Sequence, residues 1–291
     1  MTTFLRLLFG GLETGSFYAL AALGIVIIFR TSRATNFAQG SIGMFNAFLA
    51  TVLLINHGIP TWFAVIIGMI AAFIMGIVID LLIIRQAKKA NIVSKQIITF
   101  GLILVLLGLA PMIFGSVPLS FPRMIPDGQF QIADAGLTYN ALLNMSLGVV
   151  IMIVLLYFLQ YTKWGLAVRV TASNPATARL MGVPTSFVTM GAWAIAAALG
   201  ALSALMLAPN FMVDPSMMED VQLNALLAGV IGGFQTFHGP VIAAYLIAVL
   251  RNLLLYYVSP VWGNSIIFLL ILIFIVVRPN GLIGKKIVKK V

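Results

Sequence analysis

Neutral polar side chains interrupt an apolar stretch at residues 36–55, and they are the groups best suited to handle a solute. Asn36, Gln39, Ser41 and Asn46 lie within it. Each such group costs about 1 to 3 kcal/mol if it is buried without a hydrogen-bond partner. They are therefore expected to face protein or a polar path. Hydrogen bonds between helices explain any single one of them equally well.

Ionisable residues inside the apolar stretches are few. Glu13 lies in the first stretch, and Asp80 lies close to Arg85, with which it is expected to pair. Arg251 is expected near the outer membrane interface. Glu13 is a candidate for the solute path because buried acids in membrane segments are functional by default. It lies near the outer end of its stretch, so a side chain that reaches the interface is the alternative. Asn224, in a glycine-rich stretch, is the sixth path candidate.

Catalytic constellations are missing from the sequence. The chain has 0 cysteines and 2 histidines, His57 and His238, so no thiolate metal site and no nucleophile–histidine–acid triad can be assembled. The run GLIGKK at 281–286 lacks the spacing of a phosphate-binding loop. We predict that the chain is not an enzyme and binds no metal or cofactor.

Residues 163–186 carry the punctuation of a short helix. Asn174 is a good N-cap, Pro175 suits the first helical position, and Gly182 suits the position after the C-cap. So short a helix is marginal in water alone and is expected to be held by a partner. Leu180 and Met181 offer that partner an apolar surface. An ordinary connector packed on its own bundle is the alternative.

Composition and span length define the fold class. The chain is 62% hydrophobic and 8% charged, which excludes an ordinary water-soluble domain. A spanning helix needs about 20 largely apolar residues. We predict an all-α, polytopic transmembrane bundle of eight or nine membrane segments, some of them broken or re-entrant, forming a single transmembrane domain over 1–291. The continuous segments are 5–29, 60–84, 96–114, 141–160, 187–208 and 262–277; the interrupted ones are 36–55, 221–235 and 239–257.

Cationic residues predict the orientation. If every segment crosses, all Lys and Arg except Arg6, Arg123 and Arg251 fall on one face, which the positive-inside rule makes cytoplasmic. The C-terminus is then cytoplasmic, and the net charge of +10 reflects topology and membrane lipid rather than nucleic acid. Acidic residues of the opposite loops are Asp127, Asp134, Asp214, Glu219 and Asp220. The last three are expected to lie in a solvated loop that docks an external protein, together with Arg123, Asp127 and Asp134; a cation site is the alternative.

The run R-x-x-A-x-x-P-x-x-A-R-L-M-G-V at 169–183 resembles the coupling segment of ABC importer permeases, specifically the branched-chain amino acid permease family. Residues 15–48, 229–252 and 278–286 resemble the same family in the same order. The resemblance implies that 169–184 docks an ATPase. The coupling residues are Arg169, Ala172, Asn174, Pro175, Ala176, Arg179, Leu180, Met181 and Gly182.

The family resemblance also implies the partners. They are a second permease, a paralogue rather than an identical copy; two cytoplasmic ATPase subunits that use ATP and Mg; and an extracytoplasmic solute-binding protein. The expected function is the permease subunit of an importer for branched-chain or other apolar amino acids in a bacterial inner membrane. An ion-coupled secondary transporter acting without ATPases is the alternative.

Overall fold

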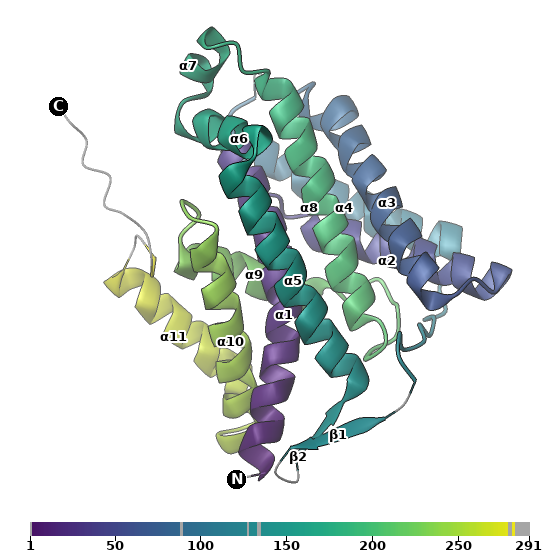
Figure 1. Cartoon of the computed structure of the whole chain (residues 1–291). Helices are drawn as coiled ribbons and strands as arrows, with labels where there is room; N and C mark the ends of the chain where they lie inside the picture. The colour runs from purple at the N-terminus through teal and green to yellow at the C-terminus, as the bar shows by residue number, and fades with distance from the viewer. Residues whose placement is uncertain (1, 88–89, 127, 133–134, 279–280, 283–291) are drawn as a thin grey trace.

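Helices make up most of the chain in the computed structural model, which describes residues 2–87, 90–126, 128–132, 135–278 and 281–282 (Figure 1). The predictions that concern Lys88, Lys89, Asp127, Asp134 and the C-terminal lysines lie outside these residues. The helices in the described part are α1 (Thr2–Ser32), α2 (Gln39–His57), α3 (Thr61–Ile79), the π-helix η1 (Asp80–Ile84), α4 (Ile92–Phe114), α5 (Tyr139–Tyr161), α6 (Lys163–Ser173), α7 (Pro175–Leu180), α8 (Thr185–Leu207), α9 (Glu219–Gly232), α10 (His238–Tyr257) and α11 (Gly263–Val277). The strands β1 (Gln129–Ile132) and β2 (Ala135–Thr138) form one antiparallel hairpin.

Seven helices of the described part are long and apolar enough to cross a membrane. They are α1, α2, α3 with η1, α4, α5, α8 and α10. The apolar helix α11 is shorter, at 15 residues. The predicted all-α polytopic bundle is confirmed. Helix α9 has 14 residues, and a rise of about 1.5 Å per residue carries it only about 21 Å, too short to cross alone.

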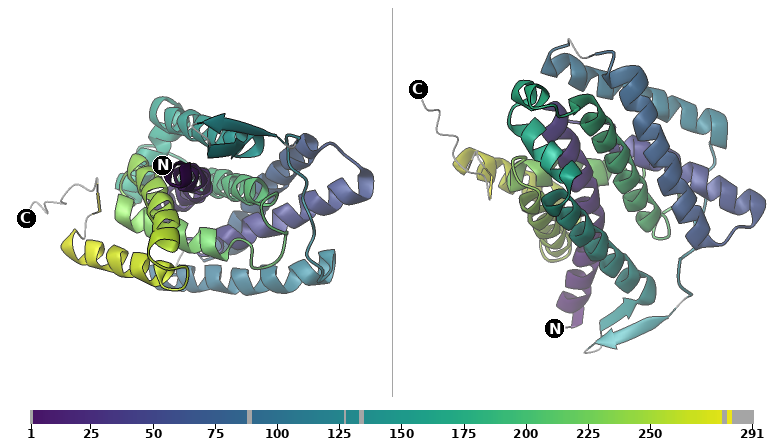
Figure 2. Two further views of the ribbon diagram at one scale, coloured as in Figure 1. Left: turned by 90° about the horizontal axis from the view of Figure 1, so that it is seen from below. Right: turned by 45° about the horizontal axis from the view of Figure 1, so that its top comes forward.

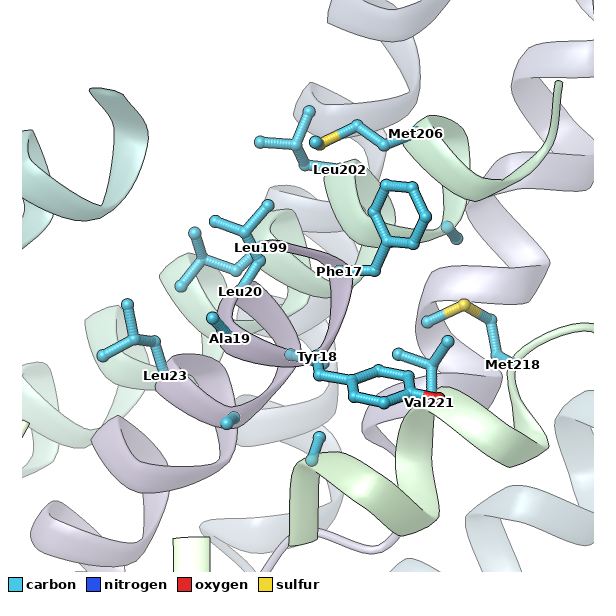
Figure 3. Packing of buried hydrophobic residues seen from close by; sticks show 14 of the residues in the cluster. Phe17, Tyr18, Ala19, Leu20, Leu23, Leu199, Leu202, Met206, Met218 and Val221 are labelled. Atoms are coloured by element: carbon cyan, nitrogen blue, oxygen red, sulfur yellow. The ribbon is translucent and has the colours of Figure 1, made fainter. Parts of the chain in front are cut away.

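Two helices form the centre of the bundle. In both α1 and α8, 78% of the residues in the most apolar 18-residue stretch are buried, so apolar residues occupy all sides of these helices. Figure 3 shows Phe17 and Tyr18 of α1 packed among Leu199 and Leu202 of α8 and Val221 of α9. By contrast α3, α4 and α5 are mostly exposed on their outer faces, as expected of helices that contact lipid.

Close backbone approach fixes α2 against α8. A Cβ at Gly43 would lie 2.5 Å from the carbonyl oxygen of Gly200. Such a distance is far inside van der Waals contact, so glycine is required there. The pair brings the start of α2, with its polar side chains, onto the central helix.

The molecule has two distinct ends (Figures 1 and 2). The hairpin end contains β1, β2 and the first turns of α1, and the α7 end contains α6, α7 and the last turn of α1. A β-bridge between Leu119 and Val213 ties two loops together near the hairpin end. Arg30, Arg33 and Arg169 share one pocket at the α7 end, as the predicted clustering of cations requires.

Candidate functional site

A cavity of about 490 Å³ opens at the hairpin end between α1, α9 and α10. Its walls combine apolar residues with charged residues of both signs. The charged members are Glu13, Asp214, Asp220 and Arg251, and the apolar members include Phe17, Leu207, Met217, Val221 and Leu255. The walls thus bring carboxylates, a guanidinium and apolar surface together in one cavity.

Glu13 is held in place by two amides. The side-chain nitrogen of Asn144 donates to its Oε1 over 2.7 Å, and that of Asn210 donates to the same oxygen over 3.1 Å. Asn144 is fully buried on α5, while Asn210 follows α8. The carboxylate of Glu13 is thereby positioned at the cavity wall rather than reaching freely toward an interface.

An ion pair forms the opposite wall. Arg251 Nη1 contacts both Asp220 Oδ2 and the hydroxyl oxygen of Tyr18. The Tyr18 hydroxyl donates to Asp220 over 2.7 Å, and Arg251 Nε donates to Asn264 over 2.9 Å. The Arg251 side chain is only 18% exposed and that of Asp220 49%. Its guanidinium turns to these partners, and a position of Arg251 at the outer membrane interface stays a prediction.

Asn224 lies directly behind this ion pair. Its side-chain nitrogen donates to the carbonyl of Asp220 over 2.9 Å and approaches the Tyr18 hydroxyl at 3.4 Å. Its Oδ1 is buried, with no hydrogen-bond partner among the described residues. Of the six predicted path residues, Glu13 lines the cavity and Asn224 contacts residues that line it.

The polar residues at the start of α2 do not line the cavity at the hairpin end. Asn36 Oδ1 accepts from the amide of Ala38 over 3.0 Å, and Gln39 Nε2 donates to the carbonyl of Ala196 over 2.5 Å. Asn46 donates to the carbonyl of Ile42 over 2.8 Å within its own helix. All three side chains are buried. Gln39 thereby joins α2 to α8, and Asn46 also approaches the sulfur of Met75 on α3 at 3.3 Å, whereas the bonds of Asn36 are local. Their contact with a solute stays a prediction.

Ser41 is the exception in that stretch. It is partly exposed and lines an apolar groove of about 210 Å³ between α2, α4 and α9. Gln222 lines the same groove and accepts from the backbone amide of Gly40 over 2.6 Å. Helix α9 is thus fastened to the first turn of α2 beside Ser41.

Tyr18, Asp220 and Arg251 were not identified as a site from the sequence. Tyr18 is separated from Arg251 by 233 positions, so no local pattern joins them. The available signal was Arg251 itself, a cation within an otherwise apolar segment, because such residues pair with another group when they are buried.

The α7 segment has the predicted punctuation. Asn174 Oδ1 accepts from the amides of Ala176 over 2.9 Å and Thr177 over 3.1 Å, and Pro175 is the first helical residue. After the helix, the Gly182 amide donates to the Arg179 carbonyl, and the Val183 amide to that of Ala178. These bonds form a Schellman motif, which places Gly182 in the left-handed region at φ +80°.

The tip of α7 presents apolar surface. Leu180 is 89% exposed and Met181 70%, whereas Ala178 is fully buried against the bundle. Helix α7 lies at the extreme of the molecule (Figure 1), so two apolar side chains are exposed there.

Other predicted coupling residues make contacts within the chain. Arg169 donates to the carbonyls of Leu159 and Gln160 at the end of α5, where a cation also complements the helix dipole. Arg179 Nε donates to Thr185 over 3.0 Å. The contact of either arginine with an ATPase stays a prediction.

These features define a polytopic helical membrane protein with a polar cavity at one end and a protruding capped helix at the other. A family model described as the permease component of the branched-chain amino acid transport system matches residues 7–276. The chain belongs to this family of transport permeases, which confirms the resemblance seen in the sequence.

Curated relatives agree with the family. The chain is 27% identical to the high-affinity branched-chain amino acid transport system permease protein LivH of Salmonella typhimurium, covering 99% of this chain and 98% of LivH. It is 25% identical to the probable LivH of Methanocaldococcus jannaschii, over 94% and 91% of the two chains. It is also 26% identical to the autoinducer 2 import permease LsrC of Yersinia pseudotuberculosis, over 89% and 72%. No solved structure matches the chain.

Proposed function

We propose that this chain is the permease subunit of an ABC importer for branched-chain or other apolar amino acids in a bacterial inner membrane. Two cytoplasmic ATPase subunits hydrolyse ATP with Mg, and a second, paralogous permease completes the membrane unit. An extracytoplasmic binding protein delivers the solute at the hairpin end. The α7 end and the C-terminus then face the cytoplasm.

The exposed tip of α7 carries this proposal. A capped helix of six residues that keeps Leu180 and Met181 in solvent is poorly stabilised by its own contacts. An apolar tip of this kind is accounted for if another protein covers it. Closure of the ATPases would then act on α7 and, through α6, on the bundle.

The hairpin-end cavity supports the class of solute. Arg251 matches a carboxylate, Glu13 matches an ammonium group, and the walls formed by Phe17 and Leu255 match an apolar side chain. The names of the LivH relatives point to branched-chain amino acids, whereas that of LsrC points to autoinducer 2. The zwitterionic character of the cavity favours the amino acid.

One observation favours a secondary transporter instead. The Asp220–Arg251 pair with Tyr18 is a set of ionisable groups within the apolar helices, as ion coupling requires. Proteoliposomes distinguish the two functions. The secondary transporter takes up amino acid driven by an ion gradient when this chain is present without ATPases, and the importer does not.

The coupling role is tested by Leu180→Asp in the assembled transporter. A charge at the tip would be desolvated on docking, so binding-protein-stimulated ATP hydrolysis and amino acid uptake are expected to fall together. Leu166→Asp is the matched control, because Leu166 is a half-exposed leucine of α6 near the same end.

Loss of both activities in Leu180→Asp alone supports the docking of α7. Wild-type stimulation and uptake in Leu180→Asp, with the subunits assembled, would remove the coupling role.

A further inference from the structure

Another polar cavity lies at the α7 end, directly beneath the coupling segment. Its lining differs from that of the pocket formed by Arg30, Arg33 and Arg169. It has a volume of about 170 Å³ and is bounded by the end of α1, η1, α4, α7 and the start of α8. Among the described residues that line it are four cations, namely Arg33, Arg85, Lys95 and Arg179, against the single carboxylate of Asp80. We call this cavity the basic pocket.

The carboxylate cannot neutralise these cations. Asp80 lies 3.6 Å from Arg85, which accounts for one positive charge. Arg33 and Arg179 use some of their donors on neutral oxygens, those of Ala172 and Thr185, which leaves their charges uncompensated. Three of the four positive charges therefore lack a negative partner among the described residues of the pocket walls.

The pocket also holds buried donors without acceptors in the described part of the chain. Thr171 is 1% exposed, and its hydroxyl makes no hydrogen bond there. The Nε of Arg85 is likewise buried and without a partner. Buried polar groups are normally hydrogen-bonded, so unsatisfied donors beside uncompensated cations indicate a missing acceptor of negative charge.

We propose that the basic pocket binds a phosphate-type anion, with an anionic phospholipid headgroup as its principal source. A phosphate group fits the volume of the pocket, and a folded peptide does not. Leu82 and Val93, each two positions from a lining residue of the pocket, are exposed and apolar, so the helices that bound the pocket also present apolar surface suited to lipid. Basic pockets between helices on the cytoplasmic side of a membrane are suited to such headgroups.

The bound phosphate has a mechanical role. It accepts hydrogen bonds from Arg179, next to the tip of α7, from Arg85 at the end of η1 and from Lys95 in the first turn of α4. The coupling segment is thereby fastened through charged groups to helices on the other side of the pocket. This role rests on the proposed function, because it places the α7 end at the anionic inner leaflet.

Lipid binding by the purified chain tests the pocket without any ATPase. Native mass spectrometry in neutral detergent measures the affinity for phosphatidylglycerol and for phosphatidylcholine. Lys95→Gln removes a cation, and Thr171→Val removes the unpaired hydroxyl at nearly constant volume. Lys163→Gln is the matched control, an exposed lysine of α6 outside the pocket.

Wild type is expected to prefer phosphatidylglycerol, and Lys95→Gln to weaken its binding about fivefold, the effect of one cation near a membrane surface. Thr171→Val should weaken it as well, and Lys163→Gln should not. Equal weakening by Lys95→Gln and Lys163→Gln would mean diffuse attraction and would overturn the pocket. The proposal would also be overturned if Lys95→Gln and Thr171→Val both bound phosphatidylglycerol with wild-type affinity.

Inorganic phosphate distinguishes the two possible sources of the bound anion, a phospholipid headgroup and free phosphate. If millimolar phosphate, but not chloride, raises the thermal stability of wild type in neutral detergent and displaces phosphatidylglycerol, the site also accepts the free anion. If neither phosphate nor phosphatidylglycerol binds and only an ATPase protects the pocket, the proposal is wrong. Failure of this test leaves the importer function intact, since that function is measured by ATP hydrolysis.

Discussion

Arg33 donates hydrogen bonds to the backbone carbonyls of Ala172 and Ser173, across 139 and 140 positions of the chain. It ends α1 in the left-handed region, with φ at 58°, the one non-glycine residue of the described chain to do so. The central helix is therefore bonded to the last residues of α6, next to the Asn174 cap. We expect this link to transmit a movement of α7 to α1, which also carries Glu13 and Tyr18.

Replacement of Arg33 by Gln is expected to uncouple transport from ATP hydrolysis. These charged hydrogen bonds lie at an exposed site, where solvent weakens them, and their loss loosens the link between α6 and α1. Uptake per ATP hydrolysed should fall severalfold in proteoliposomes. Lys163→Gln, which makes the same charge change outside this link, should keep the wild-type ratio; an unchanged ratio in Arg33→Gln would show that α1 is not driven through this contact.

Loss of the N-cap is expected to loosen α7. Asn174→Ala removes the acceptor for two amides and costs about 1 kcal/mol of local stability. Hydrogen exchange of the amides of residues 176–180 should then speed up about fivefold. Asn174→Asp keeps the acceptor and should exchange like wild type, and equal exchange in all three proteins would contradict the cap.

The Asp220–Arg251 pair should show strong coupling in a double-mutant cycle. Asp220→Asn leaves Arg251 without a counter-charge, which costs about 3 to 5 kcal/mol at a fully buried site and less here because Asp220 is half exposed. Adding Arg251→Gln is expected to restore part of the lost thermal stability. Strictly additive effects of the two changes would show that the pair is energetically unimportant.

Close packing of α2 on α8 predicts that Gly43→Ala is destabilising. The added methyl group meets the Gly200 carbonyl and should cost about 1 to 3 kcal/mol, measured by thermal unfolding in detergent. A Cβ at Gly101 on α4 would have no described atom within 4 Å, so Gly101→Ala serves as the control and should be as stable as wild type or more so. Equal stability of both variants would contradict the packing.

Local features were predictable from the sequence. Asn174, Pro175 and Gly182 act on amides and carbonyls within a few positions, so residue type and spacing sufficed to predict α7. The long spans were predictable because hydrocarbon thickness sets their length. For α9 the sequence predicted only an interrupted segment at 221–235, and the structure shows that the helix ends after 14 residues.

Long-range relationships were not predictable. Arg169 has the position of a docking residue, yet its guanidinium binds the end of α5, which lies 9 to 10 positions earlier. Tyr18, Asp220 and Arg251 meet because α1, α9 and α10 pack together, and nothing near them in the chain indicates it. Arg33 gives no signal of a left-handed backbone, since glycine or asparagine is usual there.

Docking of α7 onto an ATPase is the central claim, and cysteine cross-linking tests it most directly because the chain has 0 native cysteines. Leu180→Cys is placed in the assembled transporter with cysteines on the ATPase surface, and Phe130→Cys on β1 is the control at the other end. We predict a cross-link to the ATPase from Leu180→Cys and none from Phe130→Cys. A cross-link from Phe130→Cys and none from Leu180→Cys would contradict both the coupling role of α7 and the orientation of the chain.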